Sequence, residues 1–267
     1  MRESFLSVPR LCLAATVLSA TVFVARADEA PAAGAAPAGP ALSFNVGAIS
    51  EYRYRGIAQS RFDPALQGGA DYGAASGLYV GTWLSTIRWI KDAGTLNGVD
   101  TGSTPLEWDL YGGYKGELTP GLGFDVGGLA YVYPNNRFGR VSGGSDANTF
   151  ELYGALVVGV VSAKYSVALT DLFGNADTKG SGYLDLSAAF DLGQGWSLTP
   201  HVGRQEVRHL GAASYTDYAL TLAKDFGGGL SASAAAIGTD ASKAIYVAPD
   251  GRFLGRTALV VGLKASF

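Results

Sequence analysis

The stretch that decides the fold is 106-LEWDLYGGYK-115, in which apolar and polar side chains alternate. Leu106, Trp108 and Leu110 fall on one face of an extended chain, and the acidic residues between them fall on the other, because successive side chains of a β-strand point to opposite faces. The same period of two returns in 259–267 at the end of the chain. Each such segment is predicted to be a strand with one face toward an apolar medium.

Similar runs of roughly ten residues recur along the chain, separated by breaks that contain glycine or proline. Ten residues suit a strand that crosses ~25 to 30 Å of hydrocarbon at a tilt. After residue 27 no segment stays apolar for the ~18 residues that a membrane helix needs, which excludes a bundle of membrane helices. We count about twelve runs, which start close to Leu42, Ala65, Gly77, Pro105, Gly121, Thr149, Val161, Gly182, Gln194, Thr216, Gly229 and Arg256.

The breaks alternate in length. Those after even-numbered runs are short, such as Thr119-Pro120, whereas those after odd-numbered runs are long, such as 89–104 and 134–148. A barrel with both termini on the periplasmic side produces this rhythm, because its periplasmic turns are short and its extracellular loops longer. A soluble secreted β-sandwich shares the period of two but gives no reason for the rhythm. We therefore predict an all-β fold, a transmembrane up-and-down antiparallel β-barrel of about 12 strands in residues 41–267.

The N-terminal 40 residues are predicted to lie outside the barrel. Residues 1–27 combine early arginines, an apolar stretch and the motif Ala25-Arg26-Ala27, which is typical of a secretory signal peptide cleaved after Ala27. Residues 28–40 are an Ala/Pro/Gly leader that we expect to be disordered. Removing 1–27 takes away three arginines and one glutamate, so the formal charge moves from −3 to −5. This mild acidity argues against a nucleic-acid partner, and Cys12 is lost with the signal, which leaves no disulfide.

Polar residues opposite the apolar faces must point into the barrel. A water-filled passage lined by these charges would select ions or solutes, whereas mutual pairing of the charges would plug the interior. Twelve strands lie between the filled eight-stranded barrels and the open porins of sixteen strands or more. Inward glycines such as Gly81, Gly113 and Gly127 favour an opening. The predicted pore-lining residues are Glu51, Arg53, Arg55, Gln67, Asp71, Glu107, Asp109, Lys115, Glu151, Lys164, Asp185, Asp217 and Lys264.

The segment 51-EYRYRG-56 is the sharpest local feature. We read it as the end of the first strand, followed by a loop over 57–64, so that Glu51, Arg53 and Arg55 share the inward parity near the extracellular mouth. Two fixed positive charges there would make an anion-attracting eyelet. The alternative is a structural ladder, in which the arginines pair with Glu51, Asp71 and the closing strand.

Catalysis and metal binding are poorly supported by the sequence. His201 shares the inward parity, but no serine or asparagine forms a recognisable motif around it or around His209. The mature chain lacks cysteine, and its two histidines are eight residues apart, which is a weak metal signature. We therefore predict no catalytic, cofactor-binding or metal-binding residues and expect that the protein is not an enzyme.

A family resemblance covers nearly the whole mature chain. The stretch from Ser43 to Trp83, SFNVGAISEYRYRGIAQSRFDPALQGGADYGAASGLYVGTW, resembles the start of the TorF family of proteobacterial porins. The blocks EWDLYGGYKGEL from Glu107, ELYGALV from Glu151 and GSGYLDLSAAFDL from Gly180 look like later blocks of that family. The resemblance implies an outer-membrane barrel with a channel role. The insertions 91–102 and 137–146 fall in long loops, where they could change selectivity without touching the barrel.

Together these features give three hypotheses. The first is an outer-membrane channel for passive diffusion of small hydrophilic solutes or ions. The second is a closed structural or adhesive barrel that acts through its extracellular loops, and the third is the soluble sandwich. For a barrel, the expected partners are outer-membrane lipid and lipopolysaccharide, and the outer-membrane assembly machinery, because the terminal Phe267 resembles the signature that this machinery reads.

Overall fold

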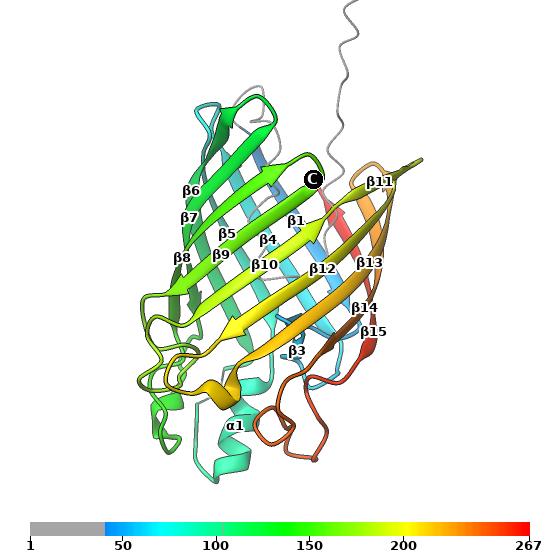
Figure 1. Ribbon diagram of the computed structural model, residues 1–267. Helices are drawn as coiled ribbons and strands as arrows, with labels where there is room; N and C mark the ends of the chain where they lie inside the picture. The colour runs from blue at the N-terminus through cyan, green and yellow to red at the C-terminus, as the bar shows by residue number, and fades with distance from the viewer. Residues whose placement is uncertain (1–40, 103) are drawn as a thin grey trace, which may run out of the picture.

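A computed structural model describes residues 41–102 and 104–267. The predicted signal peptide, residues 1–27, and the predicted leader, residues 28–40, lie outside the described residues. Within that part of the chain, twelve antiparallel strands form the wall of a closed barrel (Figure 1). They are β1 (Ala41–Ile49), β4 (Ala65–Gly73), β5 (Leu78–Thr86), β6 (Leu106–Thr119), β7 (Leu122–Val132), β8 (Thr149–Val158), β9 (Val161–Ala168), β10 continued by β11 (Gly182–Ala188, Phe190–Gly193), β12 (Trp196–Glu206), β13 (Tyr215–Gly227), β14 (Leu230–Thr239) and β15 (Ala258–Ser266).

Each wall strand pairs with its neighbours in sequence, and β1 also pairs with β15. This closing seam runs over five residue pairs, from Asn45 opposite Ser266 to Ile49 opposite Gly262. The ring therefore leaves no wall strand of the described residues with an unpaired edge, which removes the main hazard of an exposed sheet. The predicted twelve-stranded up-and-down barrel is confirmed, and every strand starts within two residues of its predicted position.

The two ends of the barrel differ. At the short-turn end, neighbouring strands are joined by tight connections such as Pro120-Gly121, where Gly121 has a φ of 83° that favours glycine. The opposite, long-loop end carries the extended connections, and the C-terminus lies at the short-turn end (Figure 1). The predicted rhythm of short and long breaks is thus present in three dimensions.

Side chains sort by face along every wall strand. Leu66 and Leu259, on the outward face, are 67% and 70% exposed, whereas Asp109 and Asp217, on the inward face, are fully buried. Because the apolar rows face away from the barrel and do not meet between two stacked sheets, the soluble-sandwich hypothesis is wrong.

The first strand is shorter than predicted. β1 ends at Ile49, and the chain then turns into the interior and forms a small hairpin from β2 (Arg53–Tyr54) and β3 (Ile57–Ala58). Its two turn residues, Arg55 and Gly56, have φ values of 46° and 79°, as a two-residue type I′ turn requires. Glu51, Arg53 and Arg55 are therefore not wall residues, and the strand parity assigned to them is corrected.

In the described residues, three short helices lie in the long loops: α1 (Trp89–Asn97), η1 (Phe138–Arg140) and η2 (Gly211–Ala213). α1 occupies most of the break predicted over 89–104, and it ends at Gly98, whose φ of 65° is left-handed. Ile90 of α1 is fully buried, and its carbonyl accepts a hydrogen bond from Thr101 Oγ1 at 2.8 Å. No helix of the described residues is both long and apolar enough to cross a membrane.

Candidate functional site

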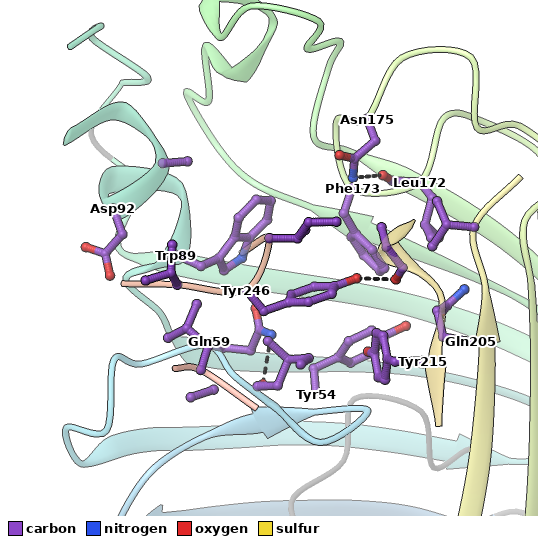
Figure 2. A pocket seen from close by; sticks show the side chains of 18 of the residues that line it. Tyr54, Gln59, Trp89, Asp92, Leu172, Phe173, Asn175, Gln205, Tyr215 and Tyr246 are labelled. Atoms are coloured by element: carbon purple, nitrogen blue, oxygen red, sulfur yellow. Dashed lines mark hydrogen bonds between the residues drawn. The ribbon is translucent and has the colours of Figure 1, made fainter. Parts of the chain in front are cut away.

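The candidate site is built around the inner hairpin, which we define as residues 51–58. Its tip presses against the wall, since a Cβ added at Gly56 would lie 2.4 Å from Thr239 Cγ2 and 2.8 Å from Asp217 Cβ. Only glycine fits at this turn, both because of the close approach and because of the positive φ. On its long-loop side the inner hairpin borders a cavity, which Figure 2 shows from close by.

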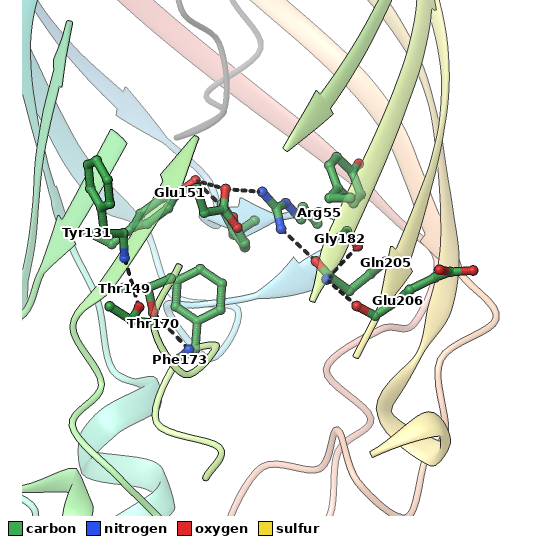
Figure 3. Close-up of polar contacts among 12 residues, drawn as sticks. Arg55, Tyr131, Thr149, Glu151, Thr170, Phe173, Gly182, Gln205 and Glu206 are labelled. Atoms are coloured by element: carbon green, nitrogen blue, oxygen red, sulfur yellow. Dashed lines mark hydrogen bonds and ion pairs between the residues drawn. The ribbon is translucent and has the colours of Figure 1, made fainter. Parts of the chain in front are cut away.

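Arg55 connects the inner hairpin to strands on the far side of the barrel (Figure 3). Its Nη2 forms an ion pair with Glu151 Oε2 on β8 at 2.7 Å, and its Nη1 donates to Gln205 Oε1 on β12 at 2.6 Å. The guanidinium also lies 4.1 Å from the ring centre of Tyr183 on β10. A cation buried to 2% exposure is therefore matched by a carboxylate, an amide and an aromatic face.

Other contacts anchor the base of the inner hairpin. Arg53 pairs with Glu51 at 2.8 Å and donates to the carbonyl of Arg256 at 2.7 Å. Tyr52, fully buried, donates from its hydroxyl to Glu107 Oε1 on β6 at 2.6 Å, and Tyr133 donates to the other oxygen of the same carboxylate at 2.8 Å. The hairpin is thus held across the interior by charged and hydrogen-bonded groups, which narrow the barrel at this level.

A second polar cluster lies nearer the short-turn end. The Tyr79 hydroxyl donates to Asp125 Oδ1 at 2.6 Å and also contacts the Tyr153 hydroxyl. The ammonium groups of Lys164 and Lys115 lie 4.3 Å and 5.7 Å from the ring centres of Tyr153 and Tyr79. Sequence reasoning missed Asp125, although its position between the outward residues 124 and 126 carried the same parity signal as the other inward carboxylates.

His201 sits between two inward aspartates. Its Nε2 lies 2.9 Å from Asp217 Oδ2 and its Nδ1 lies 3.2 Å from Asp185 Oδ1, while Tyr183 donates to Asp217 Oδ1 at 2.9 Å. The cluster cross-links β10, β12 and β13 from the inside. Exposed His209 lies in a loop, and its Nδ1 is 3.1 Å from Asp177 Oδ2. The described residues contain no group of three or more ligands that could hold a metal ion.

Comparison with known proteins places the chain in a family. A family model described as a bacterial protein of unknown function, Gcw_chp, matches residues 32–267. The chain belongs to the Gcw_chp family. The matched model does not bear the TorF name, so the resemblance to TorF stays a prediction. No curated protein matches this sequence significantly.

Solved structures share the fold of this Gcw_chp protein at low sequence identity. A KdgM porin has a TM-score of 0.53 and 9% identity over 84% of this chain and 99% of that chain. A NanC porin has a TM-score of 0.52 and 12% identity over 85% and 99%. The COG4313 outer membrane channel from Pseudomonas putida F1 has a TM-score of 0.52 and 13% identity over 89% and 98%. At identities this low, the similarity shows a shared fold alone.

The inward glycines of this Gcw_chp chain do not leave open space, contrary to the inference drawn from the sequence. A Cβ at Gly81 would lie 2.3 Å from the ring of Tyr111, and one at Gly127 would lie 2.5 Å from the Tyr153 hydroxyl. Each glycine faces the tyrosine opposite it on the neighbouring strand. The aromatic ring covers the missing side chain, as in aromatic rescue of glycine, and occupies the interior.

The remaining pore-lining candidates are distributed over the inward face of the Gcw_chp barrel. Gln67 donates to Ser85 Oγ at 3.2 Å, and Asp71 accepts from the Tyr111 hydroxyl, so Asp71 does not pair with the arginines of the inner hairpin. Asp109 is fully buried on β6, and Lys264 is half-buried on β15. The structure brings Glu51, Arg53, Arg55, Glu107 and Glu151 together around the inner hairpin, and Asp185 with Asp217 around His201.

Proposed function

We propose that this protein is an outer-membrane channel for passive diffusion of small hydrophilic solutes or ions, and that the inner hairpin sets the width and selectivity of the passage. The observation that carries the proposal is a ring of strands with an apolar outer face whose charged interior is bridged by Arg55. Fixed charges that face each other across a narrow passage discriminate between ions. The shared fold of porins and an outer membrane channel supports this function.

In this proposal the short-turn end faces the periplasm and the long-loop end faces the exterior. The signal peptide is removed after Ala27, and the outward leucines and aromatics contact lipid and lipopolysaccharide. Phe267, which is 75% exposed next to the seam, is available to the assembly machinery before the barrel closes. The thirteen predicted pore-lining residues line the passage or the hairpin that narrows it.

Single-channel recording tests the proposal directly. The full chain is inserted in planar bilayers and compared with a variant whose residues 51–58 are replaced by a Gly/Ser linker. We expect small, ion-selective steps from the natural protein and larger, weakly selective steps from the variant, because the linker lacks the groups that bridge the interior. Replacing residues 139–144 of a long loop, which are exposed or half-buried, is the matched control and should leave the steps unchanged. If neither the natural protein nor the hairpin variant conducts, the channel assignment is wrong.

The second candidate is the closed structural or adhesive barrel. It is favoured by the extent of the hairpin's contacts, which reach Glu107 on β6, Glu151 on β8, Gln205 on β12 and Asp217 on β13. The same recordings separate the two functions. A silent natural protein with a conducting hairpin variant would identify the hairpin as a plug, whereas uptake of graded sugars into vesicles that contain the natural protein would establish diffusion.

A further inference from the structure

A cavity of about 240 Å³ lies between the inner hairpin and the long loops. The hairpin contributes Tyr54, Ile57 and Ala58 to its wall, and α1 contributes Trp89 and Ala93. The rest comes from further residues of α1, from strand ends such as Gln205 and Tyr215, and from the loops at the long-loop end (Figure 2). An engineered apolar cavity of about 150 Å³ accommodates benzene, so this cavity is large enough for one ring with a substituent.

The wall is aromatic and almost without charge. Seven of the described lining side chains are aromatic rings, drawn from the hairpin, α1 and four loop or strand-end segments. Among the described lining residues, Asp92 carries a charge, and it is paired with Arg61. Burial raises the pKa of Tyr246, so this phenol stays neutral. Such a wall favours an uncharged ligand, because a charged one would lose its hydration without gaining a partner.

Trp89 supplies the polar contact that defines the ligand. Its ring is held by an edge contact with Tyr133, at 5.2 Å between ring centres, and by a tilted contact with Phe138, at 5.3 Å. Its Nε1 is buried and has no hydrogen-bond acceptor among the described residues. A buried donor normally has a partner, and this one belongs to a side chain that lines a cavity.

Other polar side chains in the wall already make at least one hydrogen bond each. Gln59 donates to the carbonyl of Ile57 at 3.0 Å, Asn175 to that of Leu172 at 2.9 Å, and Tyr246 to that of Ala213 at 2.6 Å. A site for a sugar would need several polar groups aimed at its hydroxyls. Trp89 Nε1, which has no partner among the described residues, stands among aromatic faces, and this arrangement fits a flat ring with one acceptor.

We propose that this cavity binds a neutral, single-ring aromatic compound that carries one hydrogen-bond acceptor, with Trp89 Nε1 as the donor and the surrounding rings as stacking partners. The aromatic faces hold the ring by edge and offset contacts, and the indole N–H fixes its orientation. The assignment goes beyond the channel function, because binding at the long-loop end does not depend on whether the barrel conducts.

Isothermal titration of the purified full chain with benzamide tests the proposal. Benzamide is neutral, soluble in water and carries a carbonyl acceptor. Trp89→Phe keeps an aromatic ring but removes the N–H, and we expect it to weaken binding by roughly tenfold, as the loss of a buried hydrogen bond does. Trp196→Phe, at an outward-facing indole on β12, is the matched control and should bind like the natural protein. Titration into empty micelles corrects for partitioning.

Two further measurements keep the outcome decisive. Ala93→Phe fills the cavity from α1, one helical turn after Trp89, and keeps the indole N–H in place. It should abolish benzamide binding. Benzylamine, which is cationic, and glucose should not bind the natural protein. The proposal is overturned if the natural protein does not bind benzamide, if Trp89→Phe and Ala93→Phe bind it as tightly as the natural protein, or if glucose binds more tightly than benzamide.

Discussion

At the scale of single residues, Arg55 adopts a strained backbone conformation that its side-chain contacts stabilise. Its φ of 46° lies in the left-handed region, which non-glycine residues rarely adopt. The conformation is retained because the guanidinium reaches Glu151 and Gln205 at the same time. The arginine of the predicted eyelet is therefore fully engaged with the wall, and in the proposed channel its charge would act on the passage together with that of its partner.

The first prediction concerns this charge. Arg55→Ala removes the cation and leaves the buried Glu151 carboxylate, so the interior becomes more negative and the reversal potential in a salt gradient should shift toward cation preference. The shift should grow when Arg53→Ala is added, because Glu51 then also loses its cation. Arg140→Ala, at a half-exposed arginine in a long loop, is the control. Unchanged reversal potentials would remove both hairpin arginines from any role in selectivity.

At the scale of elements, the pairing of β7 with β8 illustrates why glycine recurs on the inward face. Gly127 lies opposite Tyr153, and the phenol extends over the glycine toward Tyr79 and Asp125. A tyrosine on one strand thus fills the space that the glycine on the neighbouring strand leaves. The packing couples three strands through side chains as well as through the backbone ladder.

This arrangement predicts a cost for adding one methyl group. Gly127→Ala places a Cβ 2.5 Å from the Tyr153 hydroxyl and 2.6 Å from the carbonyl of Gly112, and backbone cannot move aside cheaply. We expect the free energy of unfolding to fall by about 1–3 kcal/mol, the usual effect of overpacking. Gly154→Ala, on the outward face of β8 with its nearest neighbour 4.0 Å away, should be nearly neutral. Urea unfolding followed by tryptophan fluorescence in lipid vesicles measures both.

The wall elements could be predicted from the sequence, and the inner hairpin could not. Strands were found because each has one apolar face, a local property with a period of two. The segment 51–55 has the same alternation, so the sequence predicts it as part of the first strand. Its position inside the barrel depends on contacts of Arg55 with Glu151 and Gln205, which are 96 and 150 residues away in the chain. No local pattern encodes partners at that distance.

α1 escaped prediction for a related reason. Its nine residues are too few for a stable helix in isolation, and it is held by the burial of Ile90 and by the contact of Trp89 with Tyr133 and Phe138. The cavity beside α1 could not be predicted from the sequence either, since its wall is assembled from seven separate parts of the chain. Inward parity did place His201 correctly, but the aspartates that flank it became neighbours only through strand register.

At the scale of the whole molecule, the barrel separates an apolar exterior from a charged interior. This division predicts that the cost of an outward charge depends on its depth. Leu220→Arg, in the middle of β13, should lower the free energy of unfolding in lipid vesicles by about 2–4 kcal/mol, whereas Leu118→Arg, near the short-turn end of β6, should cost about 0–1 kcal/mol. Guanidinium titration of both variants gives the comparison. Equal effects at the two depths would contradict a membrane-spanning wall.

The closing seam also has a kinetic consequence. The amide of Val261 bonds to Ser50 Oγ across 211 positions of the chain, and the entropy lost on closing a loop increases with its length. We therefore expect the ends to dock after the intervening hairpins have shortened the loop between them, which would make ring closure a late event of refolding. Under a mechanical pull on either terminus, the short seam should also be the joint that peels first, so the barrel would unravel one hairpin at a time from that joint.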